Sequence, residues 1–324
     1  MKKRSISYVC AAALAAVFLT GCGGSGKTTV NIGYFNNVTH AQALYMKAEG
    51  TLEEALPDAT LNWVSFNAGP SEVEALFSGN IDIGYIGPVP AITANVRSDG
   101  DVTLLSGATK AGAELIRAAG SDIESVEDLS GKTVAIPQIG NTQHLCLLKL
   151  MEDAGLSTVE EGGDVTVSAV ENADVLNMMD AGNIDAAFVP EPWGSTLVES
   201  GAEIVLDYDE AYMNGDYPVA VVVVRNDFLK AHPDVVKAFL EAHEQTTDYM
   251  RDNIADCAKV VNDEINSATG KQLSESVLQN AFTKIILSTE VNETAMKEFG
   301  DLSVAQGFID ATYESLYTDK SLLN

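Results

Sequence analysis

The chain has 324 residues, of which 46% are hydrophobic and 20% are charged, with 26 Gly and 9 Pro. This composition excludes a disordered, fibrous or low-complexity protein and predicts a globular one. Because one compact core rarely spans so long a chain, we expect a large α/β domain or two lobes of about 100 to 150 residues each. The 19 Lys and Arg are outnumbered by 47 Asp and Glu, and the net charge of -28 excludes nucleic acid as a partner because it repels a phosphate backbone.

The N-terminal residues predict an export signal. Basic residues at 2–4 precede an apolar run at 8–19, whose twelve residues are too few to cross a bilayer as a helix. The run ends in Leu-Thr-Gly-Cys at 19–22, which resembles the lipobox of bacterial lipoproteins. The resemblance implies cleavage before Cys22, lipidation of Cys22 and a lipid anchor on the extracytoplasmic face of the cell membrane. There are two alternatives for this segment: a cleaved secretory signal in which Cys22 has no role, and a membrane helix.

Cysteine and histidine usage indicates no metal site. Cys10 leaves with the signal, so Cys146 and Cys257 are the cysteines left besides Cys22, each within an apolar helical pattern. Buried, inert thiols are the usual case in such patterns, and a single disulfide is the alternative. The four His are scattered, and no Cys-x-x-Cys, His-Glu-x-x-His or carboxylate loop with metal spacing occurs. We therefore predict neither a metal nor a cofactor.

Strand and helix patterns alternate from residue 30 onward, which predicts an α/β fold with largely parallel sheets. The first series is a strand, a polar loop, a helix, a strand, a helix and a strand. Ser71 and Glu74 have the three-residue spacing of a capping box, so we expect the second helix to begin at Ser71. The elements lie at 30–35, 36–39, 40–50, 61–66, 71–77 and 81–86.

The same series returns about 104 residues later. The second series consists of a strand at 133–136, an amide-rich loop at 138–143 and a helix at 144–155. His144 therefore aligns with His40 at an offset of 104. The Gly-Asn-Ile-Asp run that begins at Gly79 recurs at Gly182, at an offset of 103. Agreement between the two offsets makes an accident improbable and predicts two similar α/β lobes.

The remaining elements connect the lobes. Strand patterns at 104–108 and 113–117 complete the first lobe and cross to the second, and the valine-rich strand at 219–224 crosses back. The mostly helical residues 227–324 are expected to pack on the first lobe. The predicted organisation is a signal at 1–21, a tether at 22–29, the first lobe at 30–114, the second lobe at 115–218, and a return to the first lobe at 219–324.

Five runs together resemble one protein family. They read GYFNNVTHA, FNAGPSE, DIGYIGP, PQIGNT and VPEPW, and begin at residues 33, 66, 82, 137 and 189. They are similar to the solute-binding components of ABC importers for aliphatic sulfonates, taurine and nitrate, over about residues 30–245. The resemblance implies the type II periplasmic-binding-protein fold, with a ligand cleft between two α/β lobes joined by two crossover strands. It also implies a monomer that takes up a small anion and has an ABC permease and ATPase as partners.

Helix ends give this cleft a physical basis. The carboxyl ends of parallel strands lead into helix N-termini, where unpaired backbone amides carry partial positive charge and attract an anion. Glycines let the amides approach a ligand, and hydroxyl and amide side chains add neutral donors. The candidate ligand-binding residues are Asn36, Thr39, His40, Gly69, Pro70, Ser71, Gly87, Pro88, Gln138, Asn141, Thr142, Glu191 and Trp193.

Several candidates also have a purely structural interpretation. Ser71 can cap its helix, residues 87–88 can form only a turn, and 141–142 can cap the helix at His144. For His40 and His144 a structural or rim role is favoured. Trp193, after a Pro-Glu-Pro turn, is expected to line a pocket.

Glu191 and the ligand class stay open. A carboxylate beside a bound anion is unfavourable, so Glu191 either points away or pairs with an amine on the ligand. An alkanesulfonate is the first hypothesis for the ligand, with taurine, nitrate and a thiamine-type pyrimidine as alternatives. A pyrimidine-synthesising enzyme on the same fold is the competing function, but no catalytic triad or carboxylate pair is evident, so we predict a binding protein without catalysis.

Overall fold

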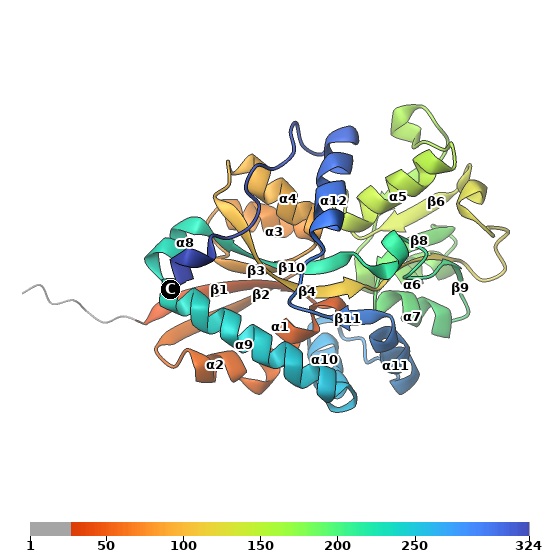
Figure 1. The fold of residues 1–324 in the computed structure, drawn as a ribbon. Coiled ribbons are helices and arrows are strands. Elements are labelled where there is room, and N and C mark those ends of the chain that lie inside the picture. The colour runs from red at the N-terminus through yellow and green to blue at the C-terminus, as the bar shows by residue number, and fades with distance from the viewer. Residues whose placement is uncertain (1–26, 324) are drawn as a thin grey trace, which may run out of the picture.

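The computed structural model describes residues 27–323 and contains two α/β lobes that lie side by side (Figure 1). The first lobe has a six-stranded sheet with the order β11-β4-β10-β3-β1-β2. Strand β1 is parallel to β2 and β3, whereas β10 is antiparallel to both β3 and β4. The strands are β1 (Thr28–Phe35), β2 (Ala59–Phe66), β3 (Ile83–Ile86), β4 (Val102–Ala111), β10 (Pro218–Arg225) and β11 (Ile285–Leu287).

The second lobe repeats this arrangement in a five-stranded sheet with the order β7-β6-β8-β5-β9. Strand β6 is parallel to β7 and β8, and β5 is antiparallel to β8 and β9. Ile32 pairs with Ile83 in the first sheet, and Val134 pairs with Ala186 in the second. The α/β fold with two similar lobes is therefore confirmed. The strands are β5 (Ala113–Arg117), β6 (Thr133–Ile136), β7 (Thr166–Ala169), β8 (Ala186–Pro190) and β9 (Glu203–Leu206).

Helices cover both faces of the first sheet, which explains why its central strands are apolar on both sides. On β10, Val221 and Val223 face one core, while Val222 and Val224 face the other. The first core also receives α3 (Gly69–Phe77), α4 (Pro88–Arg97) and α12 (Glu293–Ala305). The second receives α1 (Ala41–Glu49), α9 (Pro233–Asp252), α10 (Ile254–Thr269) and α11 (Glu275–Thr283).

The other helices are short or belong to the second lobe. They are α2 (Thr51–Ala55) and α8 (Asn226–Ala231) in the first lobe, and α5 (Thr142–Asp153), α6 (Val175–Asp180) and α7 (Trp193–Glu199) in the second. Single 3-10 turns are η1 (Val38–His40), η2 (Val126–Leu129), η3 (Val159–Glu161), η4 (Asn172–Asp174), η5 (Met213–Gly215) and η6 (Lys320–Leu323). Among residues 27–323, no helix is both long and apolar enough to span a membrane. The predicted signal and Cys22 lie outside the described residues.

The chain crosses between the lobes at two places. The first crossing is the sharp step between β4 and β5, where Ala111 and Gly112 have φ angles of 61° and 78°. A side chain at Gly112 would be strained, and its Cβ would also meet the side chain of Ile285 at 2.5 Å. The return runs through residues 207–217, so β10 lies wholly in the first sheet. The expectation that the strand at 219–224 itself crosses back was therefore wrong.

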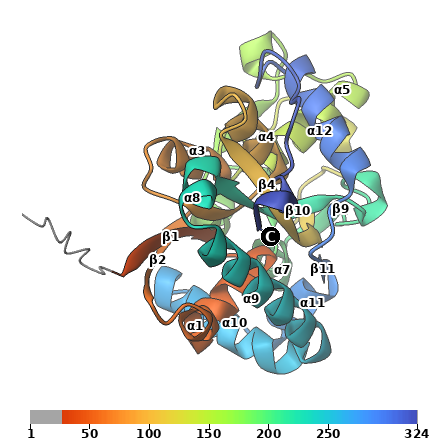
Figure 2. The ribbon, with the colours of Figure 1, turned by 60° about the vertical axis from the view of Figure 1, so that its left-hand side comes forward.

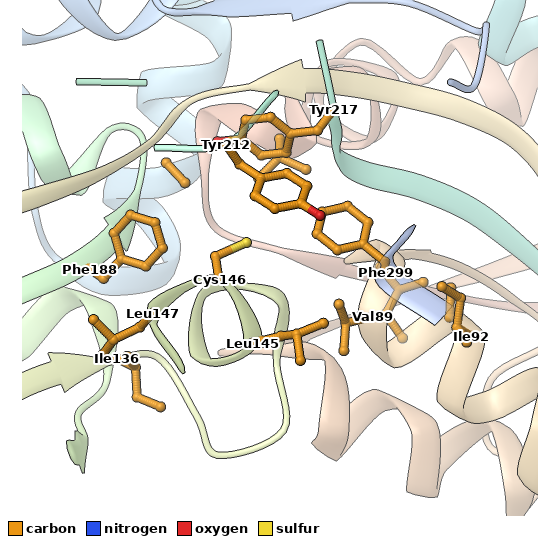
Figure 3. Close-up of a cluster of buried hydrophobic side chains, with 14 of the residues drawn as sticks. Val89, Ile92, Ile136, Leu145, Cys146, Leu147, Phe188, Tyr212, Tyr217 and Phe299 are labelled. Atoms are coloured by element: carbon orange, nitrogen blue, oxygen red, sulfur yellow. The ribbon is translucent and has the colours of Figure 1, made fainter. Parts of the chain in front are cut away.

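The C-terminal residues contact both lobes, and not the first lobe alone as expected. Helix α11 packs on α7, and α12 lies between α4 and α5 in both views of the molecule (Figures 1 and 2). At the centre of this contact, the Phe299 ring stacks on Tyr212 with 4.9 Å between ring centroids, and Tyr217 packs edge-on against Tyr212 (Figure 3). One hydrophobic core thus joins α4, α5 and α12 beside the cleft.

The two cysteines of the described chain belong to different cores. Cys146 on α5 lies in the core that joins the lobes, and Cys257 on α10 lies under the opposite face of the first sheet. Both are free and buried. Burial raises the pKa of both thiols, so both stay protonated at neutral pH.

Candidate functional site

A small cavity lies between the lobes at the carboxyl ends of the parallel strands. Its volume of about 20 Å³ is close to the minimum that holds one water molecule, so the lobes are closed around it. No Lys, Arg, Asp or Glu lines it. The lining residues are Phe35, Asn37, Thr39, His40, Asn67, Ala68, Gly69, Gly87, Pro90, Pro137, Asn141, Thr142, Gln143, Asn172, Pro190 and Val219.

Three helices from two lobes begin at this cavity. Helix α3 begins at Gly69, α4 follows Gly87, and α5 follows Asn141. The side chain of Asn141 caps α5 by accepting a hydrogen bond from the His144 amide at 2.8 Å. First-turn amides without helical partners and the aligned peptide dipoles give the cavity a positive potential without a single charged side chain.

His40 and His144 occupy equivalent positions in the two lobes. Each Nδ1 accepts a backbone N–H, from Phe35 at 3.2 Å and from Gly140 at 3.1 Å. Burial lowers the pKa of His40 to about 3 and that of His144 to about 4, so both rings are neutral at pH 7. The remaining proton is therefore on Nε2. His40 lines the cavity and can donate there, whereas His144 stacks on Phe308.

Hydrogen bonds between the lobes surround the cavity. The Trp193 Nε1 donates to Asn37 Oδ1 at 2.6 Å, and Asn67 Nδ2 donates to the Pro137 carbonyl at 2.9 Å. Asn67 Oδ1 also accepts a hydrogen bond from the backbone N–H of Asn172 at 3.1 Å. The closed arrangement is thus held by contacts within the protein itself.

The predicted site residues divide into three groups. Thr39, His40, Gly69, Gly87, Asn141 and Thr142 line the cavity together. Five others lie around the cavity. Asn36 and Trp193 line a neighbouring crevice, and Pro70 lines a second groove. The Ser71 hydroxyl donates to Gln138 Oε1 across the cleft at 3.1 Å. Pro88 begins α4 behind the lining, and Glu191 lies away from the cavity.

Ser71 does not cap its helix. Helix α3 begins two residues earlier, at Gly69, with Ala68 at the N-cap and no side-chain cap. The predicted capping box with Glu74 was therefore wrong. The cause is the Gly-Pro pair, because Pro70 sits readily in the first turn and extends the helix toward the cleft.

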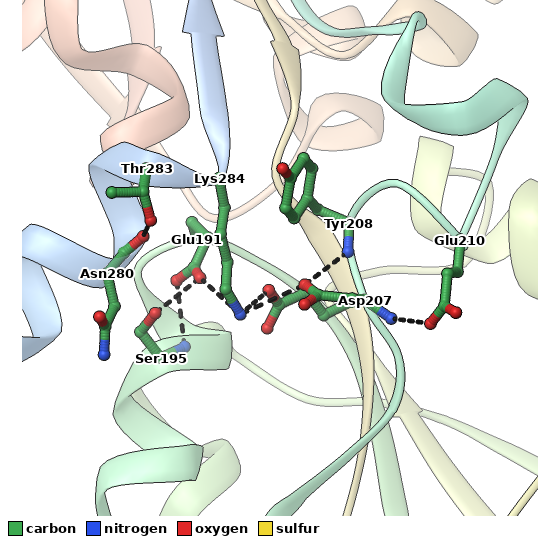
Figure 4. Close-up of polar contacts among 9 residues, drawn as sticks. Glu191, Ser195, Asp207, Tyr208, Glu210, Asn280, Thr283 and Lys284 are labelled. Carbon is green, nitrogen blue, oxygen red and sulfur yellow. Dashed lines mark hydrogen bonds and ion pairs between the residues drawn. The ribbon is translucent and has the colours of Figure 1, made fainter.

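Glu191 points into a buried cluster of charged groups and not into the cavity (Figure 4). Its carboxylate accepts from the Ser195 amide at 3.0 Å and the Ser195 hydroxyl at 2.7 Å. Lys284, which joins α11 to β11, contacts Glu191 at 3.8 Å, Asp207 at 3.4 Å and Glu114 more closely. Of the two interpretations of Glu191, the geometry favours the one in which it points away, and its placement in the ligand site was wrong.

The cluster has a defined charge balance. Burial, together with the nearby Glu191, raises the pKa of Glu114 to about 9, so Glu114 holds a proton at pH 7. Burial alone would lower the pKa of Lys284, but the surrounding carboxylates outweigh it and raise the pKa. Lys284 is therefore charged and compensates Asp207, whose pKa is lowered despite partial burial, while burial raises the pKa of Glu191 beside it.

Three further asparagines, Asn37, Asn67 and Asn172, line the cavity but were not predicted as site residues. The repeat carried a signal for all three, because Asn67 and Asn172 are 105 residues apart and each follows the edge strand of its sheet, β2 or β7. Asn37 likewise corresponds to Asn141 at the offset of 104.

Within residues 27–323, no group of three or more His, Cys, Asp or Glu is arranged to hold a metal ion.

Known proteins resemble the chain in sequence and in structure. The taurine-binding periplasmic protein of Escherichia coli (strain K12) is 34% identical over 185 residues, which span 57% of this chain and 55% of that protein. A putative aliphatic sulfonates-binding protein of the same organism is 30% identical over 217 residues, or 66% of each chain. The matched stretches thus span about half to two thirds of these relatives.

A solved structure supports the fold, and a family model supports the family. The alkanesulfonate-binding protein SsuA from Xanthomonas axonopodis pv. citri, bound to MOPS, has a TM-score of 0.72 at 23% identity and covers 86% of this chain and 93% of its own. The periplasmic-binding-protein fold is thereby confirmed. The model of the NMT1-like family matches residues 23–262, well over half of the sequence, and the chain therefore belongs to the NMT1-like family.

Proposed function

We propose that the chain is the extracytoplasmic solute-binding component of an ABC importer, which captures a small organic anion between its lobes and delivers it to a permease. The observation that carries the proposal is the cavity where helices α3, α4 and α5 begin, which is lined by uncharged residues only and includes neutral donors. Partial charges of amides act at contact distance in a dry cleft and are little affected by the net charge of the chain, which salt screens beyond about 8 Å. The relatives named for taurine and aliphatic sulfonates support a sulfonate headgroup.

An alkanesulfonate is the ligand that the lining fits best. Thr39, Thr142 and the Nε2–H of His40 are neutral donors for sulfonate oxygens. No carboxylate lines the cavity, and Glu191 is occupied by Ser195, so the ammonium group of taurine finds no ionic partner there. Taurine, nitrate and a thiamine-type pyrimidine are the alternatives.

The lining also supports binding without catalysis. It contains no Ser, Cys, Lys or carboxylate, and its His40 is neutral with Nδ1 engaged by the backbone, so it offers neither an activated nucleophile nor a general base. We expect a bound ligand to be recovered chemically unchanged after long incubation. Steady turnover of any candidate ligand would contradict this and favour the enzymatic alternative.

We propose a lipid anchor at Cys22 and a monomer as the remaining features. The Leu-Thr-Gly-Cys run after the apolar segment supports the anchor. Cys22→Ala should release the protein from the membrane fraction or stop its processing. Normal processing with unchanged membrane retention would contradict the anchor.

A thermal-shift screen with calorimetric confirmation tests the function. Methanesulfonate, taurine, nitrate and a thiamine-type pyrimidine are compared on the mature chain, and a ligand at 100 times its Kd should add about 2.7 kcal/mol of stability. Gly87→Ala serves as the blocked variant, because the added Cβ would lie 2.6 Å from Thr142 Oγ1 across the cleft and prevent closure. Its φ of -66° suits alanine, so the fold should be retained.

Val159→Ala is the control, since Val159 is an exposed residue of the second lobe outside the cleft. The control should bind as the wild type does, and Gly87→Ala should not bind. Absence of stabilisation by every compound, or unchanged binding by Gly87→Ala, would contradict the proposal.

A further inference from the structure

The cavity has a much larger neighbour. A crevice of about 470 Å³ opens between the lobes beside it, and its lining is predominantly polar. Asn37, Asn67 and Asn172 line both hollows, so these three residues form the boundary between them. A groove on the other side of the cavity shares only Pro90 with it.

Hydrogen bonds between the lobes hold this boundary together. Trp193, at the crevice side, donates through Nε1 to Asn37 Oδ1 at 2.6 Å, and Asn67 accepts the Asn172 amide at 3.1 Å. Asn37, Asn172 and Trp193 are all at least 95% buried. We call Asn37, Asn67, Asn172 and Trp193 the wall.

The size of the cavity makes the wall matter. About 20 Å³ accommodates a group near the size of one water, so a bound sulfonate headgroup already fills and widens the cavity and leaves no room for a chain of several carbons. With the headgroup at the helix N-termini, a long chain must displace the wall to reach the crevice. The crevice repays little of this cost, because an alkyl chain gains little burial among Asn, Ser, Glu and Asp side chains.

We propose that Asn37 and Trp193 determine specificity by limiting the length of the ligand's chain. The inference rests on the proposed function and adds the size class of the ligand. A short chain leaves the hydrogen bond between Trp193 and Asn37 intact, and a long chain breaks it and forces the lobes apart.

The test is calorimetry with a graded series, methanesulfonate, butanesulfonate and hexanesulfonate, on the mature chain. The wild type should bind methanesulfonate about tenfold more tightly than hexanesulfonate, the equivalent of about one lost hydrogen bond. Trp193→Phe keeps a ring but removes the donor, and Asn37→Ser removes the acceptor while leaving Trp193 in place. Each variant should reduce that ratio about two- to tenfold, mainly through tighter binding of hexanesulfonate.

Trp63→Phe is the matched control, because Trp63 donates to Glu53 at the surface of the first lobe. It should leave the ratio unchanged. Equal ratios in the wild type and both wall variants, or a wild type that prefers hexanesulfonate, would overturn the inference while leaving the proposed function in place. Failure of every sulfonate to bind the wild type would overturn the assignment of a sulfonate as the ligand, and the inference with it.

Discussion

The two lobes share a scaffold. In each, a histidine accepts a backbone N–H next to the cleft, His40 in the first lobe and His144 in the second. In each, an aspartate before the third parallel strand accepts the amide of the first strand, Asp82 from Asn31 at 2.9 Å and Asp185 from Thr133 at 2.7 Å. The repeated residues thus position the backbone around the cleft.

The lobes differ in how they hold buried carboxyl groups. In the first lobe, Glu72 on α3 lies against Gly33 and Gly84, fully buried and without a hydrogen-bond partner for either oxygen. In the second lobe, Glu114 and Glu191 are equally buried but have Lys284 beside them. The repeat therefore supplies the framework, while the cation comes from a C-terminal segment that has no counterpart in the repeat.

Removing the positive charge of Lys284 should have the largest effect on the free energy of unfolding. Lys284→Met leaves Glu191 and Asp207 without a positive charge in a buried cluster, so we expect a loss of about 3–5 kcal/mol in the free energy of unfolding. Urea denaturation measures it. The double variant with Glu114→Gln should recover little, because Glu114 is already protonated at pH 7.

Lys297→Met is the control, since the Lys297 pair with Asp301 is exposed and screened by solvent, so its loss should hardly change the free energy of unfolding. Equal losses in both lysine variants would contradict the charge balance described for the cluster.

The unpartnered carboxyl of the first lobe predicts a pH dependence. Burial raises the pKa of Glu72 well above its usual value of 4.5, so the folded chain keeps a proton that the unfolded chain releases. The stability that this proton contributes is full below pH 4.5 and is lost as the pH rises toward the folded pKa. Glu72→Gln cannot titrate, so relative to the wild type it should gain about 1.4 kcal/mol per pH unit in this window.

Urea denaturation between pH 5 and 7 measures this gain, which should increase with pH until the folded carboxyl releases its proton. Glu74→Gln, on the same helix with a side chain that is 66% exposed, should show no such gain. A difference between Glu72→Gln and wild type that does not change with pH would show that Glu72 titrates normally.

Substitutions of the two histidines should distinguish a ligand-binding role from a structural role. His40→Leu removes a donor from the cavity and should weaken ligand binding by about 0.5–1.5 kcal/mol, whereas His144→Leu should leave binding unchanged. Burial lowers the pKa of His40 to about 3 and that of His144 to about 4. The contribution of the two neutral rings to the free energy of unfolding is therefore complete above pH 6.5 and is lost as the pH falls toward these values. Binding measured by calorimetry should therefore not follow a histidine titration between pH 6 and 8. Equal effects of the two substitutions on affinity would contradict the placement of His40.

Much of the fold could be predicted because its signals are local. The strands follow from short apolar runs, and two agreeing offsets of 104 and 103 revealed the second lobe. The cap at Asn141 was also visible, since an N-cap is determined within three residues of sequence. Six of the thirteen candidate site residues line the cavity for the same reason: they lie where strands end and helices begin.

The start of α3 was misplaced for a local reason, the Gly-Pro pair at 69–70, whereas the failures at the site involve partners far apart in sequence. Glu191 follows its strand as a site residue would, yet Lys284, 93 positions later, draws it into another cluster. Asn67 contacts Pro137 and Asn172 only because the lobes close on each other. Nothing in the local pattern encodes such contacts.

Periodicity, turns and caps act over a few residues, so the amino-acid pattern alone defines the two-lobed α/β framework and the helix ends that face the cleft. Which polar side chains line the cavity, which form the wall and which are neutralised elsewhere depends on tertiary packing. The physical reason is that a buried polar group is stabilised by whichever partner the packing of distant segments brings within hydrogen-bond distance.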